Sequence, residues 1–374
     1  MNKIKLACYL SVCAASSQVM AQSSVTLYGL IDTSVRYTTS NPTTSGSHSK
    51  ISLGEGAFNG PRWGLTGTED LGGGNSAIFR LESGFNIVSG KIDQQGQLFG
   101  RQAYVGLSNT TFGTLKFGRQ YGALYSFVAS VDPISAGNYS EDAWETGLTG
   151  VRYDNTVDYT KNFGPFSLEA QYSSGNQSGS TSIGRTMQVA GAYDNGTLRL
   201  GAAAQQSKDV AGRSLTMFSL GTKYSVQKLT AYAYYINSLK DPGFTIGAAG
   251  TSDPLANTSL LSNANTVFGP NTQTSERRDS FLAGALAYQF TPALRVLATY
   301  MYDHVSNVSP GATGSVQTAY AMAIYNLSVR TDVYAEVDRS HLSGASLTDP
   351  NSPLASFGGP ANRWGASIGM RHRF

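Results

Sequence analysis

Residues 327–338 read LSVRTDVYAEVD, and this stretch alternates between two kinds of side chain. The odd positions are apolar or β-branched, whereas the even positions are mostly polar and carry four charges. Because successive side chains of a strand point to opposite faces, the stretch predicts a β-strand with one apolar and one polar face. Residues 216–226 and 25–36 show the same alternation.

The segments between such strands alternate in length. Tight links lie at 71–74, 162–165, 194–196, 291–292 and 326–327. Long polar stretches separate them, at 38–59, 121–150, 239–276 and 340–362. A soluble β-sandwich would also alternate along its strands. Short turns at one end and long loops at the other are instead typical of a transmembrane barrel.

The composition agrees with an all-β fold. The chain has 42 Gly, 21 Tyr and 16 Phe, and only 14% of its residues are charged, which favours strands and turns. No apolar run is long enough for a helix to cross a bilayer. Counting the alternating segments gives about sixteen strands, and a barrel of that size encloses an aqueous lumen. We therefore expect one transmembrane antiparallel up-and-down β-barrel domain over residues 22–374.

The first 21 residues differ from the rest. Two lysines precede a short apolar run, and Ala21 ends a stretch suited to cleavage, so residues 1–21 predict a secretory signal peptide. The apolar run is too short for a membrane anchor, and the bulky residue before Cys13 suits a lipoprotein signal poorly. Both cysteines, Cys8 and Cys13, lie in this segment. The mature chain would have no disulfide and no cysteine-ligated metal.

The rest of the sequence argues against an enzyme and against nucleic-acid binding. Without its leader the chain has 25 basic and 24 acidic residues, and no basic run marks a nucleic-acid surface. Glycine-rich segments do not open helices, and the four histidines lack metal-ligand spacing. Asp303 and His304 are adjacent, so on a strand they would point to opposite faces. We expect no cofactor, no metal and no catalytic site.

Several motifs, in order along the chain, resemble the general porins of β-proteobacteria. They are SVTLYGLID at 24–32, RWGLTGTEDLGGG at 62–74, LESGF at 81–85, RQAYVGL at 101–107 and GRQY at 118–121. The ending GMRHRF at 369–374 resembles the family's last strand. The central loops show no such match. The resemblance covers both ends of the chain.

The resemblance implies a homotrimer of sixteen-stranded barrels in the outer membrane. It implies that the third extracellular loop, at about 121–150, folds into the lumen as a constriction. By similarity, Glu82 and Asp132 form the acidic side of this constriction, and the basic side is formed by Arg62, Arg101 and Arg152. The terminal Phe374 serves as an assembly signal. The loop also contains Glu141, Asp142 and Glu145, which could reach the gap or bond elsewhere.

The alternation of side chains along the strands partly agrees with these assignments. Arg62, Glu82 and Arg152 fall on polar faces. Arg101 occupies an odd-numbered position, as do Ala103 and other apolar residues of the same predicted strand. It should therefore face away from the pore unless a bulge or strand end reorients it.

The implied function is a diffusion channel for ions and small hydrophilic solutes, with a weak preference for anions. A substrate-specific channel is the alternative, and it would need a ladder of lumen aromatics such as Tyr28, Tyr234 and Tyr334. An adhesin or purely structural barrel would need a plugged lumen.

Overall fold

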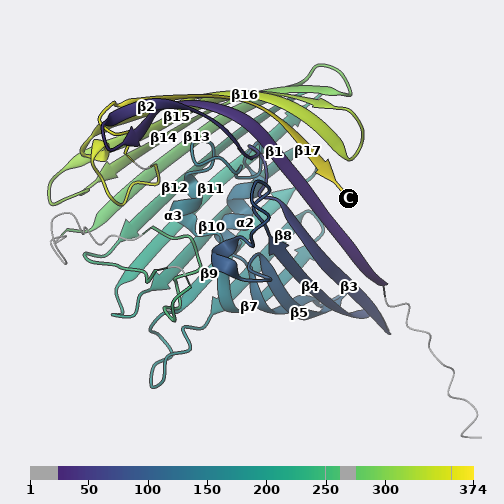
Figure 1. Ribbon diagram of the computed structural model, residues 1–374. Helices are drawn as coiled ribbons and strands as arrows, with labels where there is room; N and C mark the ends of the chain where they lie inside the picture. Colours follow the sequence, from purple (N-terminus) through teal and green to yellow (C-terminus); the bar gives the residue numbers. More distant parts are fainter. Residues whose placement is uncertain (1–23, 249, 262–274, 355) are drawn as a thin grey trace, which may run out of the picture.

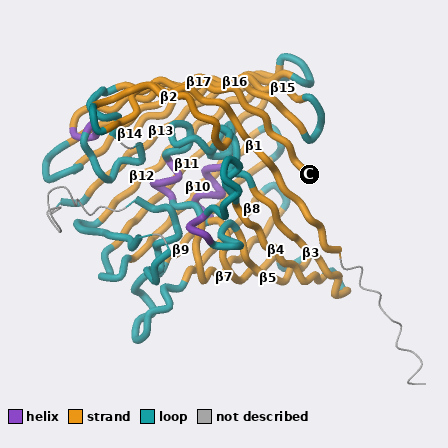
Figure 2. The backbone as a smooth tube through the Cα atoms, viewed as in Figure 1, coloured by secondary structure: helices purple, strands orange, loops and turns teal. Residues whose placement is uncertain are grey.

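The computed structural model describes residues 24–248, 250–261, 275–354 and 356–374, so the expected signal peptide lies outside the described residues. The described part forms seventeen strands in one antiparallel sheet that closes on itself (Figures 1 and 2). The first nine strands are β1 (Ser24–Thr43), β2 (Gly46–Glu55), β3 (Arg62–Gly72), β4 (Asn75–Gly84), β5 (Gln102–Asn109), β6 (Gly113–Tyr121), β7 (Arg152–Phe163), β8 (Phe166–Ser173) and β9 (Thr186–Asp194). The other eight are β10 (Leu198–Lys208), β11 (Ser214–Val226), β12 (Leu229–Lys240), β13 (Arg277–Gln289), β14 (Leu294–Ser306), β15 (Thr313–Asn326), β16 (Thr331–Gly344) and β17 (Asn362–Arg373).

The barrel nevertheless has sixteen strand positions. Strand β1 pairs with β3 over Ser24–Leu30 and with β2 from Thr33 onwards, so β2 and β3 occupy one position in succession. The ring closes where β1 pairs with β17, from Leu30 opposite Arg373 to Thr38 opposite Gly365. The predicted fold class and number of strands are confirmed.

Two predicted boundaries are wrong. Residues 38–59 are mostly strand, because β1 runs to Thr43 and a two-residue turn leads into β2. Residues 38–50 are polar on both faces, which removes the alternation that marks a strand in lipid, and only Ile51 and Leu53 alternate with polar neighbours. Residues 327–330 form a turn before β16, in which Val329 is 97% exposed. The alternation at the start of LSVRTDVYAEVD therefore continues through a turn.

The two faces of the strands differ as predicted. Along β16 the even residues from Asp332 to Asp338 are buried, whereas Val337 is 56% exposed on the outer face. On β14, Asp303 is buried and His304 is exposed, so these neighbours do point to opposite faces. Apolar outward residues suit contact with lipid, and polar inward residues suit a wet lumen. Within the described residues, no helix has the length and apolar character needed to cross a membrane.

The third loop, between β6 and β7, lies inside the barrel and carries two helices, α2 (Ala123–Ser130) and α3 (Glu145–Thr149) (Figures 1 and 2). Two 3₁₀ turns, η1 (Gln94–Gly96) and η2 (Ala345–Leu347), lie in other loops. Helix α2 has no side-chain cap of its own. The barrel wall supplies the acceptors instead, because its first two amides donate to Gln171 Oε1 at 2.8 Å and Gln188 Oε1 at 3.1 Å.

Two glycines make room for this loop on the inner wall. Gly201 of β10 pairs directly with Gly221 of β11. A Cβ at Gly201 would lie 2.7 Å from the ring of Phe127, and one at Gly221 would lie 2.7 Å from a methyl of Val131. Both distances are too short for a real contact, so only glycine allows the apolar side of the loop to dock here.

Other contacts hold the far end of the loop. The indole N–H of Trp144 donates to Thr318 Oγ1 of β15 at 3.2 Å. The amide of Leu261, in the loop after β12, donates to the carbonyl of Gly147 at 2.9 Å. The third loop is therefore fixed to opposite parts of the wall and to a second loop, as the predicted constriction requires.

Candidate pore constriction

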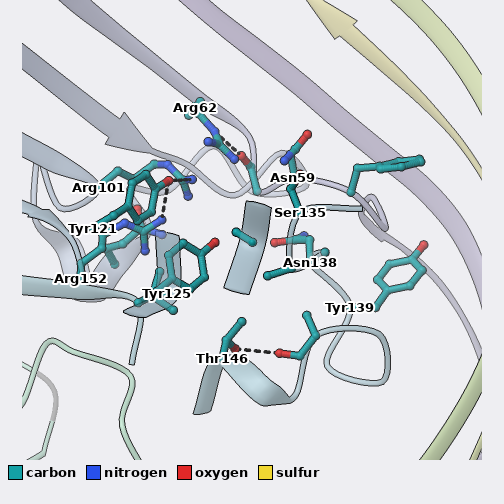
Figure 3. A pocket seen from close by; sticks show the side chains of 18 of the residues that line it. Asn59, Arg62, Arg101, Tyr121, Tyr125, Ser135, Asn138, Tyr139, Thr146 and Arg152 are labelled. Carbon is teal, nitrogen blue, oxygen red and sulfur yellow. Dashed lines mark hydrogen bonds between the residues drawn. The ribbon is translucent and has the colours of Figure 1, made fainter. Parts of the chain in front are cut away.

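A pocket of about 520 Å³ lies between the third loop and the inner wall (Figure 3). Arg62, Arg101 and Arg152 line one side, around Tyr121 and Tyr125. Loop residues 135–140 line the other side. Three sequence-predicted site residues, distant in the chain, are thus brought together.

Arg101 faces the lumen although its parity predicted otherwise. It immediately precedes the first residue of β5, so it does not follow that strand's alternation. Its Nε donates to Glu82 Oε1 at 2.8 Å, and its Nη2 donates to the hydroxyl of Tyr121 at 3.0 Å. The position of Arg101 at the end of a strand therefore reorients its side chain toward the lumen. Two side chains hold its guanidinium group.

Tyr121 separates two of the guanidinium groups. Arg152, the first residue of β7, donates from Nη2 to the Tyr121 hydroxyl at 3.3 Å. Its guanidinium carbon also lies 4.8 Å from the centroid of the same ring. Tyr121 in turn stacks on Tyr125, with centroids 5.2 Å apart. The electron-rich ring and the phenol oxygen both favour the cationic groups around them.

Arg62 is the third arginine on this side of the pocket, and together with Arg101 and Arg152 it forms what we call the basic wall. It is the first residue of β3, and its Nε donates to the carbonyl of Gly60 at 3.1 Å. Its Nη1 lies 3.9 Å from Glu82 Oε1, so the ion pair between them is long. Glu82 thus provides nearby negative charge for both Arg62 and Arg101.

The two predicted acidic residues do not form an opposing row across the pocket. Glu82 is 3% exposed and is not among the lining residues; besides Arg101, it accepts a hydrogen bond from the Tyr28 hydroxyl at 2.8 Å. Asp132 is 4% exposed and also lies outside the lining. Its carboxylate accepts the amides of Ile134 and Ala136, at 2.9 Å each, and the hydroxyl of Tyr234 at 3.1 Å.

The surroundings of Asp132 explain its placement. Its bonds to amides two and four residues ahead close a turn of the loop, which is a common use of aspartate before proline. Burial outweighs these bonds and raises the pKa of the Asp132 carboxyl to about 6. Asp132 therefore shapes the loop rather than facing solutes.

The other acidic loop residues also lie away from the pocket. Glu141 forms ion pairs with Arg36 at 3.3 Å and Arg363 at 3.2 Å. Asp142 and Glu145 are 0% exposed. None of these three is among the lining residues.

Asp93 is the acidic residue that lines the pocket, in the loop after β4. Sequence reasoning missed it, because that loop has no periodic pattern to orient its side chains. The charged lining is therefore three arginines and one aspartate, an excess of two positive charges.

Phe374 lies at the seam of the barrel. Its amide donates to the carbonyl of Gly29 at 3.0 Å, and its carbonyl accepts the Gly29 amide at 3.1 Å. The ring lies over Gly29, where any Cβ would overlap it. The last residue thus extends the pairing of the closing strands.

Comparison with known proteins gives consistent matches. The family described as Gram-negative porin matches residues 7–345. An outer membrane porin protein of Bordetella pertussis is 30% identical over 390 residues, and the match covers 95% of each protein. Outer membrane porin protein 32 of Delftia acidovorans is 34% identical over 63% of this chain and 70% of that protein.

Solved structures share the fold at lower identity. The structure named anion-selective porin from Comamonas acidovorans has a TM-score of 0.72 and 22% identity, covering 94% of this chain and all of that one. OmpT of Vibrio cholerae in its trimer form has a TM-score of 0.66 and 17% identity, covering 94% of this chain and 99% of that one.

Proposed function

Because this chain belongs to the Gram-negative porin family and is an outer-membrane channel, we propose that it passes small hydrophilic solutes with a weak preference for anions. Its relatives are channel proteins rather than enzymes. One observation carries the preference. Arg62, Arg101 and Arg152 line the pocket beside the third loop, and Asp93 is the single acidic residue among the described residues that line it.

The physical basis is the local excess of positive charge. A narrow wet passage lined by one sign of charge raises the local concentration of the opposite ion. Two unit charges at ~4 Å in water interact by only about 1 kcal/mol, so the preference should be modest. The fold is shared with a porin named anion-selective, which is consistent with this proposal.

A general channel suits the site better than a substrate-specific one. The three tyrosines that could have formed an aromatic ladder each donate their hydroxyl to a carboxylate. These pairs are Tyr28 with Glu82, Tyr234 with Asp132 and Tyr334 with Asp32. Their hydroxyl groups are therefore engaged within the protein rather than arranged to bind one solute.

The proposal includes the assembled and processed form. We expect a homotrimer in outer-membrane lipid, as the trimer form of OmpT suggests, and light scattering of the detergent-solubilised protein measures it. We also expect residues 1–21 to be removed, so that N-terminal sequencing of the membrane fraction begins at Gln22. An intact Met1 there would contradict this processing.

The ion preference is tested by the zero-current potential of the purified protein in planar bilayers under a salt gradient. An anion-selective potential at low salt is expected. A cation-selective wild type would overturn the proposed preference, while leaving the channel itself unaffected.

A further inference from the structure

We propose that a divalent cation of the calcium class binds between the third loop and the barrel wall, held by Asp142, Glu336 and Asp338. Asp142 belongs to the loop, whereas the other two lie on the lumen face of β16. One carboxylate oxygen from each residue lies within 4.8 Å of the others. This site is separate from the pocket lined by the arginines.

Unpaired carboxylate oxygens at this cluster are independent evidence for a bound ligand. Asp142 is 0% exposed, and Glu336 and Asp338 are each 2% exposed. Among the described residues, neither oxygen of Asp142 has a hydrogen-bond partner, and the same holds for Glu336 Oε1 and Asp338 Oδ1. Burying a carboxylate without a partner is costly. Asp142 is thus a fully buried, unpaired acid directed at two others, which calls for a ligand.

The neighbouring arginine leaves these oxygens available. Arg36 pairs with Glu336 through Oε2 at 3.1 Å and with Asp338 through Oδ2 at 2.7 Å. The unpaired atoms are the other oxygen of each carboxylate. A cation and Arg36 would therefore use different oxygens, and would not compete for the same position.

The charges of this region also favour a bound cation. The ion-paired group contains two guanidiniums and, with Asp142, four carboxylates: Arg36, Arg363, Glu141, Asp142, Glu336 and Asp338. Two negative charges are in excess when all four acids are ionised. One divalent cation neutralises them.

The three carboxylates suit calcium better than magnesium, because magnesium usually keeps several waters and binds only one or two carboxylates. Calcium binds oxygens at about 2.3–2.6 Å in a flexible shell, so two ligands on opposite sides of it lie about 5 Å apart. Magnesium needs about 2.0–2.1 Å and a stricter octahedron, which brings opposite ligands to about 4 Å. The three oxygens lie within 4.8 Å of one another, a span that a calcium shell accommodates, with water from the lumen completing the shell. The ion would then fasten the third loop to β16.

The test is calorimetric titration of calcium chloride into the full-length purified protein after treatment with a chelator. One calcium per chain is expected. Asp142→Asn should weaken binding at least about tenfold, since calcium affinity follows the number of charged ligands. Asp142 makes no side-chain hydrogen bond in the described structure, so this change breaks none while it removes the charge and one ligand oxygen. Glu145→Gln is the matched control, because Glu145 is equally buried and unpaired on the same loop, and it should bind like wild type.

Circular dichroism establishes that each variant is folded, and Glu336→Gln serves as the second variant if Asp142→Asn fails to fold. No calcium binding by the wild type would overturn the proposal and indicate that protons shared among the acids balance the charge. Binding that neither variant weakens would also overturn it. Neither result bears on ion selectivity, which is measured separately.

Discussion

The Nε of Arg101 donates a hydrogen bond of 2.8 Å to Oε1 of Glu82. The negative charge that accompanies the basic wall therefore lies behind an arginine, not across the gap from it. Glu82 therefore reduces the positive potential of the arginines. This arrangement determines whether each substitution in the site should shift selectivity toward anions or toward cations.

Glu82→Gln should increase the preference for anions. The change removes a negative charge that lies 2.8 Å from Arg101 and 3.9 Å from Arg62. A change of about 1 kcal/mol corresponds to roughly a fivefold change in the permeability ratio, which is an upper limit in a wet passage. Zero-current potentials measure the shift. Glu69→Gln, at an exposed position of β3, is the control, and an equal shift there would contradict a local effect.

Arg62→Ala and Arg152→Ala should each shift selectivity toward cations, because each removes one positive charge from the lining. The difference from wild type should fade near 1 M salt, where screening shortens to roughly 3 Å. Arg278→Ala removes an exposed arginine outside the pocket and should cause no shift. Arginine variants that behave like wild type would refute this placement of the constriction.

Gln171→Leu combined with Gln188→Leu should loosen the third loop. Both amides accept from the first turn of α2, and losing such a cap costs about 0.5–2 kcal/mol. Faster proteolysis within the loop and noisier single-channel current are the expected results. Gln206→Leu, on the opposite face of β10 from buried Gln205, is the control. Unchanged current noise in the double variant would argue against capping by the wall.

The stability of the protein should depend on pH through Asp132. The pKa of this carboxyl is 3.8 ordinarily and about 6 in the folded protein, so the folded state retains the proton to higher pH. This contribution to stability is full below about pH 3.8 and is lost as the pH rises to about 6. Wild type should lose up to about 3 kcal/mol over this window relative to Asp132→Asn. Urea unfolding in detergent measures it, and parallel pH profiles would show that Asp132 does not contribute.

Deleting Phe374 should lower the amount of assembled barrel in the membrane. The deletion removes two backbone hydrogen bonds to Gly29 at the seam, and unpaired backbone groups are costly in lipid. Phe374→Tyr keeps the backbone pairing and the ring, so it should assemble normally. Normal levels of the deletion variant in the outer-membrane fraction would rule out an assembly role.

Periodicity predicted the barrel well, because lipid and water impose a two-residue rhythm on every spanning strand. It was less informative about the site. The alternation along the strand predicted the wrong face for Arg101, because this residue lies just before β5 and is oriented by Glu82 and Tyr121. The Asp-Pro pair at 132–133 was the available signal that Asp132 closes a turn. The approach of Asp142 to Glu336 joins residues 194 apart in the chain, which no local pattern encodes.

The facing pair Gly201 and Gly221 gives this channel a simple evolutionary route to altered permeability. Their missing side chains admit Phe127 and Val131, whereas the pairing of β10 with β11 needs only the backbone. At Gly221 a Cβ would meet side chains alone, whereas at Gly201 it would also lie 2.5 Å from the carbonyl oxygen of Gly191. A bacterium exposed to a bulky nutrient or an antibiotic could thus change what enters the cell by one substitution at Gly221, a residue that need touch neither lipid nor solute. We expect adaptive variation in the width of the pore to appear at Gly221 as well as at the arginines.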